Sequence, residues 1–243
     1  MKKPLGKKHL VLSFLGGALF FSGISFAADA TTVTPNTEAL KFYVDGEQKT
    51  TSAQYNNQGS IVPESFRYSG TTYVPIRHVS DLLGNKMYWE PQSATISVNS
   101  PVVEIKNSKG ESIGTAILTQ DQNNVNIKVN VKNLPAGKHG IHVHQSAITN
   151  NDFATAGSHL NPEGHEHGRL NPKGQHTGDL PNLEVAADGT ANTTMVLPNA
   201  SLEKGNEHSL LGASIIIHAA PDDEMTDPTG NSGDRIAGGN IPQ

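Results

Sequence analysis

The chain has 243 residues, of which 17% are charged and 35% hydrophobic, a composition typical of one large or two modest soluble domains and not of a membrane protein. It contains no cysteine, which excludes disulfides, thiolate metal sites and cysteine nucleophiles. The formal net charge is −5, so we expect no binding to nucleic acid or to an anionic membrane surface through net charge.

The first 27 residues have the pattern of an export signal. Four lysines precede an apolar run from Leu10 to Phe26, and Ser25-Phe26-Ala27 supplies small residues for cleavage. An uncleaved membrane anchor is the alternative, but the run is short for a spanning helix and contains three glycines. We therefore expect a secreted or extracytoplasmic protein cleaved near Ala27. Loss of the four lysines leaves a net charge of −5 − 4 = −9.

A flexible linker is expected over residues 28–39, which are rich in Thr, Ala, Asn and Pro and have almost no large apolar residue. Residues 40–99 predict a small α+β module in which short strands flank one helix. Pro75 opens this helix and Gly84 ends it. Its apolar residues share one face: Ile76, Val79, Leu82 and Leu83.

This module carries a resemblance. The stretch from Tyr73 to Gly84, with Trp89 and Glu90, resembles the copper amine oxidase N-terminal-like stalk module of exported proteins from Gram-positive bacteria. The resemblance implies association with the cell wall or cell surface and carries no amine oxidase chemistry. His78 is a lone histidine on a short helix, so we expect a packing or surface role and assign it no chemistry.

Ser100-Pro101 marks the start of a second predicted domain, residues 101–243. Short runs of alternating residues, separated by Gly, Asn and Pro turns, predict an antiparallel β-sandwich. From Gln145 to Asp179 this alternation is lost, and so long a loop inside a compact domain usually has a function. The predicted strands cover residues 102–105, 114–118, 125–131 and 140–144.

Histidines are concentrated in this second domain, where nine of the 11 lie between Lys138 and Ala219. Side chains alternate along a strand, so His142 and His144 point to one face and can bind one ion. A single His-x-His motif is weak, because many surface strands carry one by chance. The further histidines in the Gly/Pro-rich loop, with Asp179, strengthen the prediction of a metal site.

Six motifs of this segment contain most of its histidines or end near the C-terminus. The motifs are His139-Gly-Ile-His-Val-His144, Ala156-Gly-Ser-His159-Leu-Asn-Pro162, His167-Gly168, His176-Thr-Gly-Asp179-Leu180, Ile215-Ile-Ile-His218 and Gly230-Asn-Ser-Gly-Asp-Arg235-Ile-Ala. In order and approximate spacing, from about Val102 to the C-terminus, they resemble the copper/zinc superoxide dismutase family. The resemblance implies a Greek-key antiparallel β-sandwich or barrel with long metal-binding loops.

The resemblance also implies two metal sites that share His159. An all-imidazole set suits Cu(II), and three imidazoles with a carboxylate suit tetrahedral zinc. The implied copper ligands are His142, His144, His159 and His218, and the implied zinc ligands are His159, His167, His176 and Asp179.

Two further residues have implied roles. Asp222 is the carboxylate expected to bond ligands of both metals and to fix their tautomers. Arg235 is the expected docking group for a small anion, because its donors are fixed and always charged. A surface ion pair with Asp234 is the alternative for this arginine.

Other histidines leave alternatives open. His165 could replace His167 in the zinc set, although His167 has the matching Gly168. His139 is expected to support a strand turn, and His208 to be exposed.

The implied function is an exported superoxide dismutase that converts superoxide to oxygen and hydrogen peroxide, with Arg235 and His159 as catalytic residues. The alternative is a non-catalytic module that binds copper or zinc for storage, delivery or structure. The sequence does not give the oligomeric state. Since every implied ligand lies beyond Ser100, residues 28–100 are expected to be dispensable for the chemistry.

The chain departs from the family at three positions. The family's disulfide positions correspond to Phe153 and Gly238, and loss of a native disulfide typically costs about 2–5 kcal/mol. Metal binding is therefore expected to contribute more of this domain's stability. Pro228 stands where a substrate-steering lysine is common, so we expect the diffusional rate to be lower than in fast members.

Overall fold

The computed structural model describes residues 34–35, 39–49 and 52–243. The predicted signal segment and most of the predicted linker lie outside these residues. Thr34–Pro35 (β1), inside the predicted linker, pairs with β6, Phe66–Tyr68. Within the described ranges, no helix has the length and hydropathy needed to cross a membrane.

The N-terminal module is built from short strands around one short helix. Strands β1, β6 and β7 form one sheet, and β2-β3, β4-β5 and β8-β9 are two-stranded. The remaining bounds are β2 Phe42–Val44, β3 Glu47–Lys49, β4 Gln54–Asn57, β5 Ser60–Pro63, β7 Thr71–Tyr73, α1 Ile76–Leu82, β8 Met87–Glu90 and β9 Thr95–Val98.

Helix α1 buries a different set of residues from the one that its apolar pattern indicates. Its buried residues are His78 and Ser80, whereas Ile76 and Leu83 are half exposed. His78 packs against the ring of Tyr55, and its Nε2 lies 3.0 Å from Glu64 Oε1. A satisfied polar contact thus fixes the helix, and His78 has the packing role expected of it.

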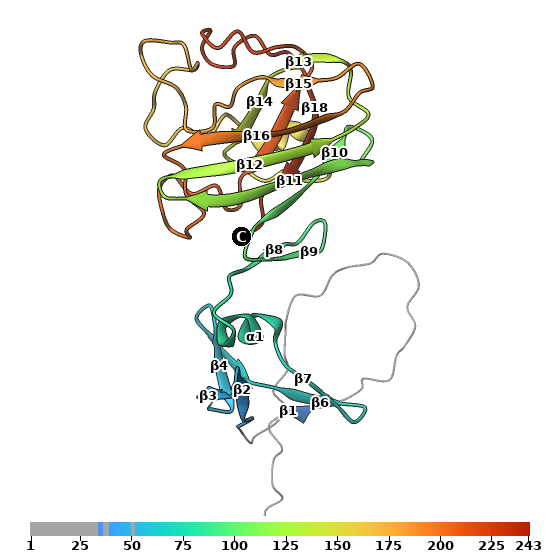
Figure 1. Cartoon of the computed structure of the whole chain (residues 1–243), viewed down its shortest axis with the longest axis vertical. Helices are drawn as coiled ribbons and strands as arrows, with labels where there is room; N and C mark the ends of the chain where they lie inside the picture. Colours follow the sequence, from blue (N-terminus) through green and yellow to red (C-terminus); the bar gives the residue numbers. More distant parts are fainter. Residues whose placement is uncertain (1–33, 36–38, 50–51) are drawn as a thin grey trace, which may run out of the picture.

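Residues 101–243 form one curled antiparallel sheet with the strand order β14-β17-β18-β10-β11-β12-β16, beside the pair β13-β15. Of the residues that the structure describes, 43% are in strands and 5% are helical, which confirms the mainly β fold class. Figure 1 shows β11, β12 and β16 in front of β14 and β18. The bounds are β10 Val102–Asn107, β11 Ser112–Asp121, β12 Asn124–Val131, β13 Gly137–His139, β14 Ile141–His144, η1 Phe153–Ala156, β15 Leu183–Val185, β16 Ala191–Pro198, β17 Ser214–His218 and β18 Arg235–Asn240.

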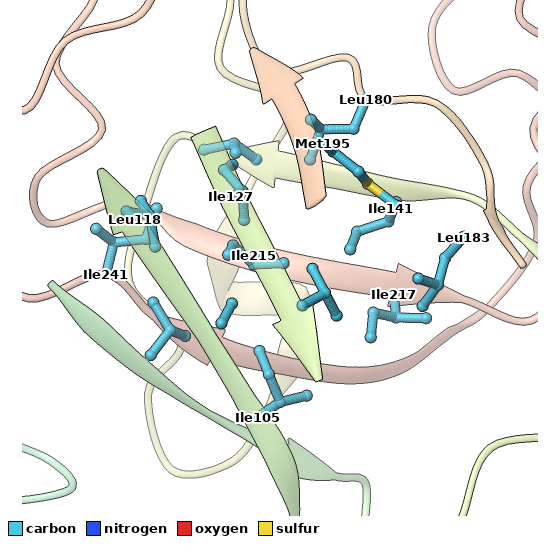
Figure 2. Close-up of a cluster of buried hydrophobic side chains, with 14 of the residues drawn as sticks. Ile105, Leu118, Ile127, Ile141, Leu180, Leu183, Met195, Ile215, Ile217 and Ile241 are labelled. Carbon is cyan, nitrogen blue, oxygen red and sulfur yellow. The ribbon is translucent and has the colours of Figure 1, made fainter. Parts of the chain in front are cut away.

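The core lies between the two halves of this curled sheet. In β12, Val125, Ile127, Val129 and Val131 are buried and alternate with more exposed polar residues, as predicted for a strand with one face on the core. Figure 2 shows side chains from both halves meeting, including Ile127 and Ile215. Burial of each such side chain contributes roughly 1.5–3 kcal/mol.

Strand β14 is buried on both faces. Ile141 and Val143 join the core, and the opposite face carries His142 and His144 under the long loop. Because β14 is at the end of the strand order, its outer edge is free to pair with that loop. Isolated bridges join His142 to Asp179 and His144 to His159. The backbone pairing therefore delivers both loop residues to the strand histidines.

Candidate metal centre

Four buried histidines each turn one unpartnered nitrogen toward the same region. Among the described residues, five buried side-chain nitrogen or oxygen atoms lack a hydrogen-bond partner, and four belong to this group. They are His142 Nδ1, His144 Nε2, His159 Nε2 and His218 Nε2. The ligand atoms of this four-histidine set lie within 4.8 Å of one another. Buried polar atoms without partners are rare, so four convergent ones fit a shared metal ion.

The second nitrogen of each ring has a partner that fixes which nitrogen faces the set. Metal-binding histidines commonly use the remaining nitrogen in this way. The contacts are His142 Nε2 with Asp222 Oδ2 at 2.8 Å, His144 Nδ1 with the Gly157 carbonyl at 2.9 Å, His159 Nδ1 with Asp179 Oδ1 at 3.0 Å, and His218 Nδ1 with the Gly233 carbonyl at 3.1 Å.

The four rings are arranged as a distorted square. The centroids of His142 and His144 are 6.4 Å apart, and those of His159 and His218 are 6.3 Å apart. All four remaining pairs are closer, at 4.0, 4.8, 4.9 and 5.7 Å. The four rings therefore surround one centre, and a set of four imidazoles suits Cu(II).

The second set, called the His3Asp set, consists of His159, His167, His176 and Asp179. Asp179 Oδ1 lies 3.0, 3.1 and 3.3 Å from the Nδ1 atoms of the three histidines in that order. A tetrahedral zinc site with ligands at 2.0–2.1 Å has ligand atoms about 3.3 Å apart. The donors therefore fit zinc, and His159 belongs to both sets through its two ring nitrogens.

Burial prepares these side chains to bind metal. Desolvation lowers the pKa of His144 to about 2, of His218 to about 3 and of His159 to about 4. These rings are neutral near pH 7, as metal ligation requires. Burial opposes ionisation of Asp179, but its hydrogen bonds with the histidines outweigh burial and hold the pKa of this carboxyl well below its usual range.

Asp222 connects the two sets. Its Oδ2 is 2.8 Å from His142 Nε2, and its Oδ1 is 3.0 Å from His167 Nε2. A side chain at Gly230 would collide with this carboxylate, because a Cβ there would lie 1.7 Å from Asp222 Oδ1. The carboxylate thus lies where the resemblance places it, between one ligand of each set.

Replacing Asp222 by alanine is expected to weaken metal binding about 10- to 100-fold, the usual cost of removing a partner of a ligating histidine. Both sets should be affected, because His142 and His167 lose their orienting contacts together. Competition with a chelator, performed separately for copper and zinc, measures this. Unchanged affinity for both ions would contradict the role; Asp121→Ala, at an exposed carboxylate outside both sets, is the control.

Arg235 lies beside the four-histidine set, since it pairs with His218 across β17 and β18. Its guanidinium donates to the carbonyls of Phe153 and Gly157, both at 2.6 Å. The salt bridges among the described residues include none with Asp234. Arg235 lines a cleft of about 400 Å³ together with His159 and Pro228. Arg235 and Pro228 therefore face the same cleft.

Phe153 and Gly238, which the resemblance aligns with a disulfide, have apolar packing around them. Phe153 packs with Ile148, Ala156 and Ile216 in a small buried cluster. A Cβ at Gly238 would lie 2.8 Å from Ile216 Cδ1 and 3.1 Å from Ile148 Cδ1. The glycine thus lets this cluster approach the sheet, and the cluster with the Arg235 contacts holds the loop.

The remaining histidines of the domain lie outside both sets. His165 Nδ1 lies 3.3 Å from the Gln175 carbonyl, and His167 occupies the set instead. His139 contacts the carbonyls of Pro135 and His218, each at 2.8 Å, consistent with support of the strand turn. His208 was expected to be exposed, but its side chain is only 20% exposed.

Sequence patterns did not indicate two supporting residues. Asp227 Oδ1 accepts the backbone N–H of His167 at 2.7 Å. Asn182 exchanges two hydrogen bonds with the backbone of Asp222, at 2.7 and 2.8 Å. Both belong to irregular loops, where no periodicity distinguishes a supporting polar residue from a solvated one.

Two proteins of related sequence match a little over half of this chain. The superoxide dismutase [Cu-Zn] 1 of Aquifex aeolicus is 40% identical over 141 residues, which are 56% of this chain and 83% of the relative. The superoxide dismutase-like protein YojM of Bacillus subtilis is 40% identical over 143 residues, 56% of this chain and 73% of the relative.

Solved structures of superoxide dismutase-like proteins are similar to the same part of this chain. A superoxide dismutase-like protein from Bacillus subtilis matches with a TM-score of 0.56 and 38% identity, over 58% of this chain and 97% of that one. A double mutant of such a protein, with a tyrosine and a proline each changed to histidine, also gives 0.56, at 39% identity over 58% and 95%.

The family description "Copper/zinc superoxide dismutase (SODC)" matches residues 112–241, more than half of the chain. The match does not extend over residues 40–99, so the stalk-module resemblance stays a prediction. The family uses copper and zinc, and the two histidine sets of this chain could bind them. With its curled antiparallel sheet and these donor sets, the chain belongs to the copper/zinc superoxide dismutase family.

Proposed function

We propose that this chain is an exported superoxide dismutase, converting two superoxide anions and two protons to oxygen and hydrogen peroxide. One observation carries the proposal: four unpartnered imidazole nitrogens converge beside a cleft that Arg235 also lines. When bound there, copper supplies the redox chemistry, taking an electron from one superoxide and giving it to a second. The chain must bind the ion, admit the anion and provide a proton.

His159 is the residue placed to hold that proton. Its Nδ1 belongs to the His3Asp set, whereas its Nε2 faces the four-histidine set without a partner. Nε2 can therefore take a proton when it is not a ligand and return it to the departing product. The contact between its Nδ1 and Asp179 Oδ1, at 3.0 Å, keeps Nε2 turned toward the four-histidine set.

Arg235 is placed to attract and orient the anion. Burial lowers the pKa of its guanidinium, but arginine remains charged in proteins. Its contacts with the carbonyls of Phe153 and Gly157 fix the plane of the group at the cleft. A fixed cation beside the four-histidine set suits a small anion better than a flexible lysine would.

A non-catalytic copper or zinc module is the competing function, since one relative bears the name superoxide dismutase-like protein. The shared His159 and the cleft with Arg235 favour catalysis, because storage of an ion requires neither. Metal analysis, combined with a dismutation assay before and after copper loading, separates the two. We expect one copper and one zinc per chain, with activity that appears on copper loading. A protein that binds both ions and stays inactive would contradict the proposed enzyme.

Export is the second part of the proposal and depends on the basic and apolar pattern of residues 1–27. We expect the protein outside the cytoplasm, with association to the cell envelope through the N-terminal module. Sequencing the N-terminus of the protein isolated from the cell-envelope and secreted fractions tests both points. Protein found only in the cytoplasm with Met1 intact would contradict export.

A further inference from the structure

The β8-β9 hairpin of the N-terminal module is joined to the end of the chain. The backbone N–H of Trp89 donates to the Gln243 carbonyl at 2.8 Å, and the N–H of Gln243 donates to the Trp89 carbonyl at 3.1 Å. Figure 1 shows the C-terminus beside this hairpin, beneath the sandwich. These reciprocal bonds make Gln243 a short extension of the hairpin. The hairpin is therefore in contact with the dismutase domain as well as with its own module.

Glu90, the last residue of β8, is only 6% exposed. Its carboxylate accepts the backbone N–H groups of Gln92 and Ser93, and the side-chain amide of Asn240 at 3.3 Å. Burial acts to raise the pKa of Glu90, but these hydrogen bonds outweigh it and lower the pKa. A buried carboxylate that is bonded in this way is held in one position.

Asn240 carries the contact onward to the loop that follows β14. Its Oδ1 accepts the N–H of Ile148 at 2.7 Å, and its Nδ2 donates to the Ile148 carbonyl at 3.0 Å. The Ile148 side chain belongs to the buried cluster with Phe153 and Ala156 of η1. Residues 148–156 are thus fixed by both backbone and side-chain contacts.

Immediately after η1 comes Gly157, whose carbonyl contacts His144 Nδ1 at 2.9 Å and Arg235 at 2.6 Å. We propose that Glu90 is a positioning residue, which acts through Asn240 and Ile148 to hold the Gly157 carbonyl and thereby the ring of His144. The hairpin thereby anchors the loop that leads to the four-histidine set. This inference rests on the proposed copper role of His144 and requires no particular turnover rate.

The other charged side chains near Asn240 do not compete with Glu90 for it. Glu104 and Lys106 line the same 220 Å³ cavity between hairpin, loop and β18, but their side chains pair with each other at 3.2 Å. Of these two carboxylates in the described residues, Glu90 is the one that accepts from Asn240. Residues 87–98 therefore act together with the second domain. Only the residues before β8 are then expected to be dispensable for the chemistry.

Hydrogen exchange on the metal-free full-length chain tests the anchor. In Glu90→Ala, the amide of Ile148 and those of the following η1 turn should exchange about tenfold faster, in line with the loss of a charged hydrogen bond. Glu104→Ala removes a carboxylate from the same cavity and should leave these amides unchanged. Asn240→Asp provides a second variant in case Glu90→Ala does not fold. It replaces the donor to Glu90 and to the Ile148 carbonyl by a carboxylate oxygen, so the η1 amides should exchange faster, whereas the Ile148 amide keeps its acceptor.

The Cu(II) electron paramagnetic resonance spectrum tests the positioning. Glu90→Ala and Asn240→Asp should shift the copper hyperfine splitting, whereas Glu104→Ala should match the wild type. Wild-type exchange in both anchor variants would overturn the proposal, and so would faster exchange with an unchanged spectrum. If the wild type itself gives no bound-copper spectrum, the copper role of His144 fails, and the exchange result still decides whether the anchor exists.

Discussion

Replacing His218 by alanine is expected to abolish dismutation while zinc binding is retained. The side chain contributes its free Nε2 to the four-histidine set and fixes Nδ1 on the Gly233 carbonyl, and it is no member of the His3Asp set. Removing a hydrogen-bond partner of a metal ligand typically lowers activity about 10- to 100-fold. Removing a ligand itself should lower it further, so we expect activity to fall by more than about 100-fold. A superoxide dismutation assay and elemental analysis of the same sample measure both effects.

His165→Ala is the matched control, because His165 lies in the same domain but outside both sets. It should retain the activity and both ions. Retained activity in His218→Ala would mean that copper binds elsewhere. Loss of zinc together with copper would mean that the two sets do not fold independently.

Reversing the charge at Arg235 is expected to reduce the rate on the order of 10-fold or more, because focusing by a local cation at a cleft is replaced by repulsion. Residues 101–243 carry nine basic and sixteen acidic side chains, 9 − 16 = −7, so the rest of the domain repels the anion. Arg235→Glu, with Lys204→Glu at an exposed position outside the cleft lining as control, isolates the local effect in kcat/KM. Equal losses in the two variants would show that only net charge matters.

Adding a positive charge at Pro228 is expected to increase the rate at the same cleft. It lines the cleft with Arg235, so Pro228→Lys should be faster than the wild type. Salt should slow this variant more strongly, because screening weakens attraction between exposed charges. The wild type is expected to show weak salt dependence, since local attraction and the acidic surface oppose each other. A variant that matches the wild type in rate and salt slope would mean that position 228 does not act on the substrate.

The prediction from sequence succeeded where a local pattern has one physical cause. Alternation in residues 141–144 requires two histidines on one face, and the structure brings both into the four-histidine set while Ile141 and Val143 join the core. The choice of His167 over His165 depended on Gly168, whose φ is +111°. A Cβ there would lie 2.3 Å from the Glu224 carbonyl, so the loop accepts only glycine beside the ligand.

The missed features depend on contacts distant in sequence. Glu90 and Asn240 are 150 residues apart, and neither strand pattern indicates that they meet. Helix α1 shows a different limit. Its apolar stripe indicated which residues share a face, but the polar pair of His78 and Glu64 determines what is buried. The spacing of apolar residues describes the helix alone. It does not show which residues of other elements pack against the helix.

The loop beside the four-histidine set is held by apolar packing and by hydrogen bonds, and the chain has no cysteine. Its folding therefore needs no oxidant, no disulfide isomerase and no oxidising compartment. A reducing agent can neither loosen the loop nor trap it in a mispaired form. Hydrogen peroxide, the proposed product, cannot oxidise a thiol of this chain, because the chain has none. Among sulfur atoms it meets only methionines, of which Met225 is 46% exposed.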